Sequence, residues 1–165
     1  MEKFETKRLF LEPLNLSHQD FIFDLVNTKG WIKFIGNRNI KTLSDAKNYI
    51  EKIENNSKTI YWVAVLKETK IPIGIITIIK RDYLEEYDFG FAFLPEYTNK
   101  GFAYEASLEV LKNIESNYKN IGAITIEENI SSIKLLEKLG FKFDKKIVLA
   151  VPKKEELLFY TKKMI

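Results

Sequence analysis

The chain has 165 residues and a formal net charge of +3, from 26 Lys and Arg against 23 Asp and Glu. This length predicts one globular domain, residues 1–165, with a core of its own. The absence of cysteine excludes disulfides, thiol nucleophiles and cysteine-ligated metals, and one histidine, His18, is too few for a histidine-rich metal site, so we expect no metal.

Hydrophobic and charge patterns limit the classes of partner that the chain is expected to bind. No apolar run approaches the ~20 residues of a membrane span, so no membrane partner is expected. The N-terminus lacks the apolar segment of a secretory signal, which favours a cytoplasmic location. Basic residues are interleaved with acidic ones, so no nucleic-acid partner is expected. Serine-hydrolase, P-loop and Rossmann glycine motifs are all missing.

The hydrophobic periodicity predicts a mixed α/β domain of order β-α-α-β-β-β-α-β-α-β-β. In chain order we expect a strand (9–13), helices opening at Ser17 and Thr42, three strands (60–66, 71–79 and 87–94), a helix over 103–114, a strand (123–126), a helix (131–139) and two strands (141–148 and 157–162). Residues 31–36 are a short apolar piece, and His18 is expected at the surface. The strands on either side of the 103–114 helix should be parallel.

The turn between the 87–94 strand and the next helix has features of a phosphate site. Pro95 ends the strand, Lys100 adds a positive charge, and Gly101 lets a ligand approach the backbone. The first N–H groups of the helix lack backbone acceptors and point towards this turn. The pattern predicts a phosphate-bearing cofactor at the strand end, although a plain strand-to-helix connection has the same pattern.

A second polar turn precedes the 131–139 helix. Asn129, Ser131 and Ser132 are residue types that cap helices, and an ordinary capped amphipathic helix explains them when they are taken alone. Because both turns follow strands of one sheet, a ligand between the two strand ends would touch both turns.

The two segments together resemble a known family. The run Thr98 to Ala106, followed by the Glu128-Asn129-x-x-Ser132 to Gly140-Phe141 segment, resembles the GCN5-related N-acetyltransferases (GNAT) of the ribosomal-protein-alanine (RimJ/RimL-like) type. The resemblance extends from Thr6 to Phe141 and includes residues 73–76 and 88–91. It implies the GNAT fold with a splayed central strand, and acetyl-CoA as cofactor.

Cofactor-binding residues follow from this resemblance by position. In such enzymes the free backbone of the splayed strand pairs with the pantetheine arm, which here places Phe91 and Phe93 beside it. The family's pyrophosphate loop, Gln/Arg-x-x-Gly-x-Gly/Ala, aligns with Thr98, Asn99, Lys100, Gly101, Phe102 and Ala103. Thr98 departs from the usual Gln or Arg, and Asn99 stands where glycine is common. Asn129 and Ser132 match a second cofactor-side cluster.

The resemblance and the missing cysteine favour direct acetyl transfer to a primary amine in a ternary complex. The backbone N–H of Phe93 would polarise the thioester carbonyl, and Ser132 would donate to the leaving thiolate. Ser132 as a mere helix cap is the alternative. Asp88 is the candidate base, acting through a water, against the alternative of a solvated charge. Tyr83 and Tyr87 are weaker candidates because a phenol titrates near pH ~10.

Similar proteins place the segment with Trp31, Phe34 and Arg38 over the acceptor amine. Aromatic side chains such as these two more often belong to a core than to a ligand site. Arg38 could pair with a carboxylate of the substrate, cover a phosphate, or equally be a surface cation. The acceptor itself, a protein N-terminus or a small amine, is left open, as is a homodimer. A non-catalytic acyl-CoA-binding module is the alternative function, motivated by Thr98 and Asn99, and nucleic-acid binding has only the net charge in its favour.

Overall fold

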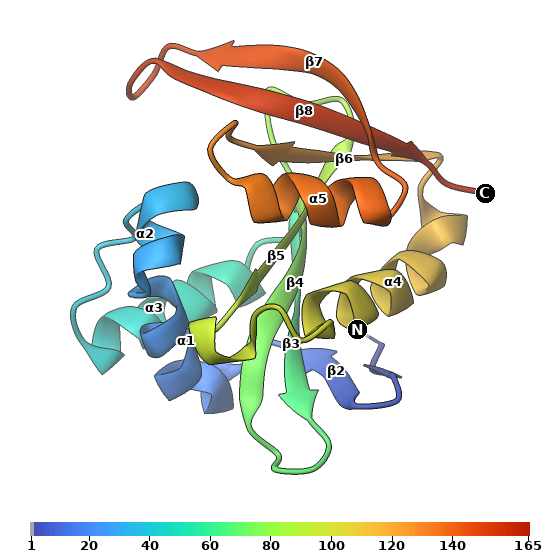
Figure 1. Cartoon of the computed structure of the whole chain (residues 1–165). Helices are drawn as coiled ribbons and strands as arrows, with labels where there is room; N and C mark the ends of the chain where they lie inside the picture. The colour runs from blue at the N-terminus through green and yellow to red at the C-terminus, as the bar shows by residue number, and fades with distance from the viewer. Residues whose placement is uncertain (1) are drawn as a thin grey trace.

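The computed structural model describes residues 2–165, which build one eight-stranded sheet (Figure 1). The strands are β1 (Phe4–Glu5), β2 (Leu9–Pro13), β3 (Thr59–Leu66), β4 (Pro72–Lys80), β5 (Tyr87–Phe93), β6 (Asn120–Thr125), β7 (Lys142–Leu149) and β8 (Glu155–Lys163). Their order across the sheet is β1-β2-β3-β4-β5-β6-β8-β7, and every neighbouring pair is antiparallel except β5 with β6. The predicted fold class and the parallel pair are confirmed.

Helices connect the strands nearly as predicted. They are α1 (Gln19–Val26), α2 (Lys29–Phe34), α3 (Leu43–Glu54), α4 (Phe102–Ile114) and α5 (Ile130–Lys138), with 3-10 turns η1 (Leu16–His18), η2 (Pro95–Tyr97) and η3 (Glu115–Asn117). Two elements, β1 and α2, are additions to the predicted order. The helix α2 forms because the Thr28 hydroxyl accepts the N–H of Trp31, and its six residues are too few to show a helical period.

The sheet separates two cores, because successive strand residues point to opposite faces. One face packs against α4 and α5 through residues such as Phe89, Val110 and Leu136. The other packs against α1 to α3 through residues such as Ile22 and Ile50. Figure 1 shows these two helical groups on opposite sides of the central strands. None of the helices within residues 2–165 is long and apolar enough to cross a membrane.

Local signals at helix ends explain where the helices begin and end. Thr42, where the sequence predicts a helix to open, forms a capping box with Asp45 at α3, and Gly140 ends α5 with a φ of 89°. The predicted opening at Ser17 is wrong: Ser17 lies inside η1, and the cap residue of η1 is Asn15, whose side chain accepts the N–H of Ser17. His18 corrects an expectation: it is 6% exposed, accepts the N–H of Asn15 at Nδ1 (3.1 Å) and pairs through Nε2 with Glu12 (2.9 Å). The ring is therefore a structural link between η1 and β2.

Candidate active site

The two central parallel strands separate as soon as they have met. Within residues 2–165, Asp88 and Gly122 are the one pair in register between β5 and β6, although β5 continues to Phe93. The other edge of β5 stays paired with β4 as far as Phe93 and Gly74. The predicted splay of the central strand is therefore present, and it leaves one edge of β5 open.

The open edge of β5 presents backbone groups of Phe91 and Phe93. Peptide groups of successive strand residues point to opposite sides, and the N–H of Leu94 donates to Ile73, the residue that follows Pro72 in β4. Alternate residues before Leu94 therefore bond to β4, and Phe91 and Phe93 direct their N–H and C=O groups into the opening. An extended ligand laid along this edge would find both donors and acceptors.

Beyond the open edge lies the loop of residues 98–103, which leads into α4. Asn99 and Gly101 adopt left-handed backbone angles, with φ of 58° and 81°. Within the described residues, the N–H groups of residues 99–104 have no hydrogen-bond acceptor, and the first bonded amide of the helix is that of Glu105, which donates to Gly101 (3.0 Å). Consecutive free N–H groups at a helix N-terminus form a binding site for an anion.

Side chains of this loop contribute less than its backbone. The Thr98 hydroxyl is occupied, because it donates to the carbonyl of Pro95 (2.8 Å). The exposed Lys100 ammonium lies 5.8 Å from the centre of the Tyr97 ring and supplies a positive charge. Phe102 is buried with its ring in the core, and Ala103 is half-buried. Both contribute their N–H groups to the loop.

The second polar turn caps α5 after β6. Asn129 is the cap residue: its side-chain oxygen accepts the N–H of Ser132 (3.3 Å) and the hydroxyl of Ser131 (3.2 Å). The alternative that Ser132 is the cap is therefore wrong. Within residues 2–165 the half-buried Ser132 hydroxyl has no hydrogen-bond partner, so it is free to serve a ligand. Because β5 and β6 are parallel, both turns lie at the same end of the sheet.

Asp88 lies at the point where the strands separate. It is 4% exposed, which corrects the expectation of a solvated charge. Its Oδ2 accepts from Arg81 Nε (3.0 Å), and its Oδ1 accepts the N–H of Ile124 in β6 (3.2 Å). Burial raises the pKa of the Asp88 carboxyl above its ordinary value, and the Arg81 guanidinium opposes the rise. These contacts give Asp88 a structural role, and its role as base stays a prediction.

The other candidates for proton transfer and acceptor binding lie on different elements. Burial raises the pKa of Tyr83, which makes it a poorer base. Trp31 is 5% exposed within the second core, so its ring packs as a core residue and is not presented to a ligand. Phe34 is half-buried. Arg38 is exposed, with its guanidinium carbon 5.9 Å from the centre of the Trp31 ring.

Comparison with known sequences identifies the family. The sequence matches the acetyltransferase (GNAT) domain over residues 8–142, which is most of the chain. The chain belongs to the GNAT acetyltransferase family. It is similar to the uncharacterized N-acetyltransferase YnaD of Bacillus subtilis, with 28% identity over 153 residues that cover 92% of this chain and 89% of YnaD.

Solved GNAT structures share the whole fold. The ribosomal-protein-S5-alanine acetyltransferase of Vibrio fischeri is 20% identical with a TM-score of 0.81, covering 99% of this chain and 97% of that one. The spermidine N-acetyltransferase of Vibrio cholerae, solved with CoA and spermine, is 19% identical with a TM-score of 0.81, covering 96% and 97%. The chain is thus an acetyltransferase that uses an acyl-CoA, and the equal likenesses do not separate a RimJ/RimL-like type from a polyamine type.

Sequence reasoning missed one residue beside the loop, Arg8. Its side chain reaches across to the 98–103 loop and donates to the carbonyl of Lys100 (3.1 Å). In the sequence, only the family resemblance at Thr6 to Leu9 points to Arg8, and it does not indicate that Arg8 contacts the loop.

Proposed function

We propose that this GNAT enzyme transfers an acetyl group from acetyl-CoA directly to a primary amine. The observation that supports it most is the open edge of β5 leading to a loop with six unpaired N–H groups, those of residues 99–104. This arrangement offers an extended chain of the cofactor a strand to pair with, and its phosphates an anion site. Acetyl-CoA supplies the acetyl group as an activated thioester.

Different residues bind different parts of the cofactor. Backbone groups of Phe91 and Phe93 hold the pantetheine arm, and the N–H groups of the 98–103 loop hold the pyrophosphate with help from the Lys100 charge. Asn129 orders the second turn at the other side of the opening. Because Thr98 is occupied by Pro95, the backbone compensates for the Gln or Arg that the family pattern has at this position.

Three groups act on the reacting atoms in this proposal. The N–H of Phe93 polarises the carbonyl oxygen, since it points into the opening. The Ser132 hydroxyl, free of other partners in the described chain, donates to the departing thiolate. The amine must lose a proton, and Asp88, the one carboxylate within β5, is the candidate base, acting through water while Arg81 holds it in place.

The acceptor is a protein N-terminus or a small amine. Relatives of this fold acetylate a ribosomal protein and spermidine according to their names, so both classes belong in the first screen. The exposed Arg38 and the half-buried Phe34 are the candidate acceptor contacts.

A calorimetric titration with acetyl-CoA, followed by thiol release over an amine panel, tests the proposal. The panel holds peptides with free N-termini, polyamines and amino acids. We expect micromolar binding and thiol release that depends on one class of amine. Binding without turnover on any amine would favour the non-catalytic module, and no binding would contradict the proposal.

A further inference from the structure

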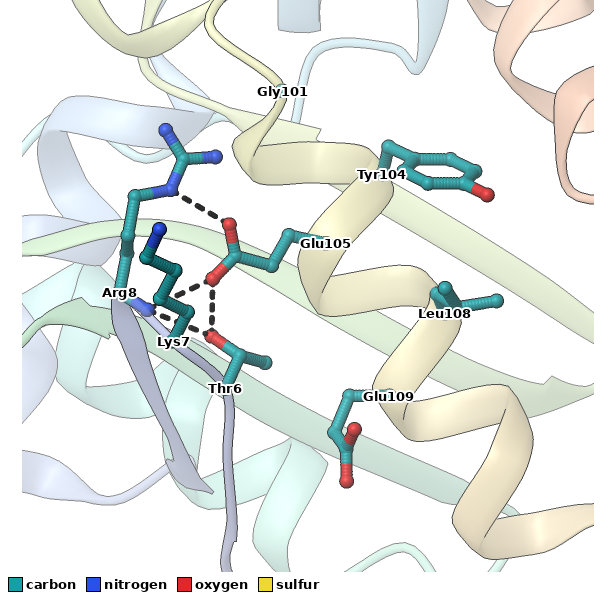
Figure 2. A pocket seen from close by; sticks show the side chains of 8 residues that line it. All are labelled: Thr6, Lys7, Arg8, Gly101, Tyr104, Glu105, Leu108 and Glu109. Carbon is teal, nitrogen blue, oxygen red and sulfur yellow. Dashed lines mark hydrogen bonds and ion pairs between the residues drawn. The ribbon is translucent and has the colours of Figure 1, made fainter.

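The segment of residues 6–8, just before β2, is tied to the start of α4 (Figure 2). Glu105 receives three bonds there: its Oε1 accepts from the Thr6 hydroxyl (2.5 Å) and the Arg8 N–H (2.9 Å), and its Oε2 accepts from Arg8 Nε (2.7 Å). The Glu105 side chain is 20% exposed and that of Arg8 40%. Charge-assisted bonds of this length to one carboxylate form a strong link.

Arg8 continues past Glu105 to the 98–103 loop. Its Nη1 donates to the Lys100 carbonyl (3.1 Å), and its guanidinium carbon lies 4.1 Å from the centre of the Phe102 ring. It therefore contacts the residues on both sides of Gly101, and a Cβ added to Gly101 would lie 3.4 Å from its Nη2. Beside these contacts lies a pocket of about 480 Å³, which is lined by Thr6, Lys7, Arg8, Gly101, Tyr104, Glu105, Leu108 and Glu109.

Besides Arg8, the buried Phe102 ring and the Thr98 bond to Pro95 hold the two ends of the loop. No side chain within residues 2–165 caps α4, because its cap residue is Gly101. Residues 98–101 are exposed, and two of them hold left-handed angles. Ordering such a loop when ligand arrives would cost affinity, whereas a loop ordered beforehand binds more tightly. The carbonyl that Arg8 holds belongs to Lys100, between the two left-handed residues.

We propose that Arg8 and Glu105 form a clamp that keeps the 98–103 loop in its anion-binding shape before the cofactor binds. Both are positioning residues, since they act through the loop backbone. The inference rests on the proposed function only for the identity of the ligand, acetyl-CoA.

NMR order parameters of the loop amides in the ligand-free protein test the clamp directly, because within residues 2–165 these amides have no hydrogen bond whose exchange could report on it. We expect Arg8→Ala to lower the order parameters of residues 99–104 from about 0.85, the value of a rigid backbone, to below about 0.6. Arg8→Lys keeps the charge but cannot make the forked contacts, and it should lower them nearly as much. Lys7→Ala removes the same charge from the same pocket, makes none of these contacts, and should leave the loop unchanged.

Steady-state kinetics give the second readout. Arg8→Lys should raise KM for acetyl-CoA about tenfold while kcat and KM for the amine stay within twofold, because the chemistry is untouched once the loop is ordered. Glu105→Gln, which is nearly isosteric, should raise KM for acetyl-CoA to a similar extent, and it replaces Arg8→Ala as the test variant if Arg8→Ala does not fold. Unchanged order parameters of the loop in Arg8→Lys and Glu105→Gln would overturn the clamp. Failure of the unmodified protein to bind acetyl-CoA would refute the proposed function instead, and the order parameters would still decide the clamp.

Discussion

Ser132 is the residue that we propose donates to the departing thiolate, and its hydroxyl has no other partner within residues 2–165. We expect Ser132→Ala to lower kcat about 100-fold, the usual contribution of one proton donor, with little change in acetyl-CoA affinity. The matched control is Ser131→Ala, because the exposed Ser131 hydroxyl is already bonded to Asn129. Pre-steady-state thiol release and calorimetry separate the two effects. Equal loss in both variants would assign the effect to the helix cap.

The Asp88 carboxylate connects β5 to Arg81, which follows β4, and to the backbone of Ile124 in β6. Asp88→Asn should lower the free energy of unfolding by about 3 kcal/mol, because it leaves the Arg81 charge without a partner in a largely buried site. Urea denaturation measures this loss, and a change below the error of the method would contradict the structural role. The pH–rate profile of the same variant decides on the base: loss of its acidic limb would assign the proton to Asp88, and an unaltered profile would remove Asp88 from the mechanism.

The link between the 6–8 segment and α4 predicts a pH dependence of stability. Burial alone would raise the pKa of Glu105, but the bonds from Thr6 and Arg8 and the Arg8 charge lower it below its ordinary value. A carboxylate whose pKa is lower in the folded than in the unfolded chain stabilises the fold while it is ionised, above the unfolded pKa of about 4.3. That contribution is lost as the pH falls through the pKa of the folded protein. Stability should therefore fall on acidification below pH ~5.

Thermal unfolding between about pH 3 and about pH 7, a range that spans the titration of Glu105, measures this effect. In Glu105→Gln the acid-dependent part of the loss should shrink, whereas Glu109→Gln, one turn along α4, should keep it. Equal pH profiles in both variants would contradict the account of Glu105.

Elements with a local cause could be predicted from the sequence. The helix opening at Thr42, the helix end just before Gly140 and the glycine-like position of Asn99 each depend on one or two neighbouring residues, and the structure contains all three. The helix α2 was missed because six residues show no clear period.

At the scale of the whole molecule, side chains that meet only after folding could not be predicted. Arg8 and Glu105 are separated by 97 positions, so no local sequence pattern indicates that they are in contact. Asp88 opens a strand, which suggests an exposed charge, and it is buried because the separating strands and Arg81 enclose it. The 98–103 loop was predicted from its own residues and a family resemblance. The contacts of Arg8 and Glu105 that hold the loop form only once the strands and α4 have come together.

The proposed function requires that acyl-CoA binds along the open edge of β5 and over the 98–103 loop. Amide chemical-shift mapping on the isotope-labelled protein during titration with acetyl-CoA tests it most directly. We predict that the largest shifts fall on residues 91, 93 and 99–104, whose amides face the opening or belong to the loop, and on Ser132, whose hydroxyl would meet the sulfur of the cofactor. Shifts confined to the pocket beside Arg8 and Glu105, at Lys7 and Leu108, or no shifts at saturating ligand, would contradict it.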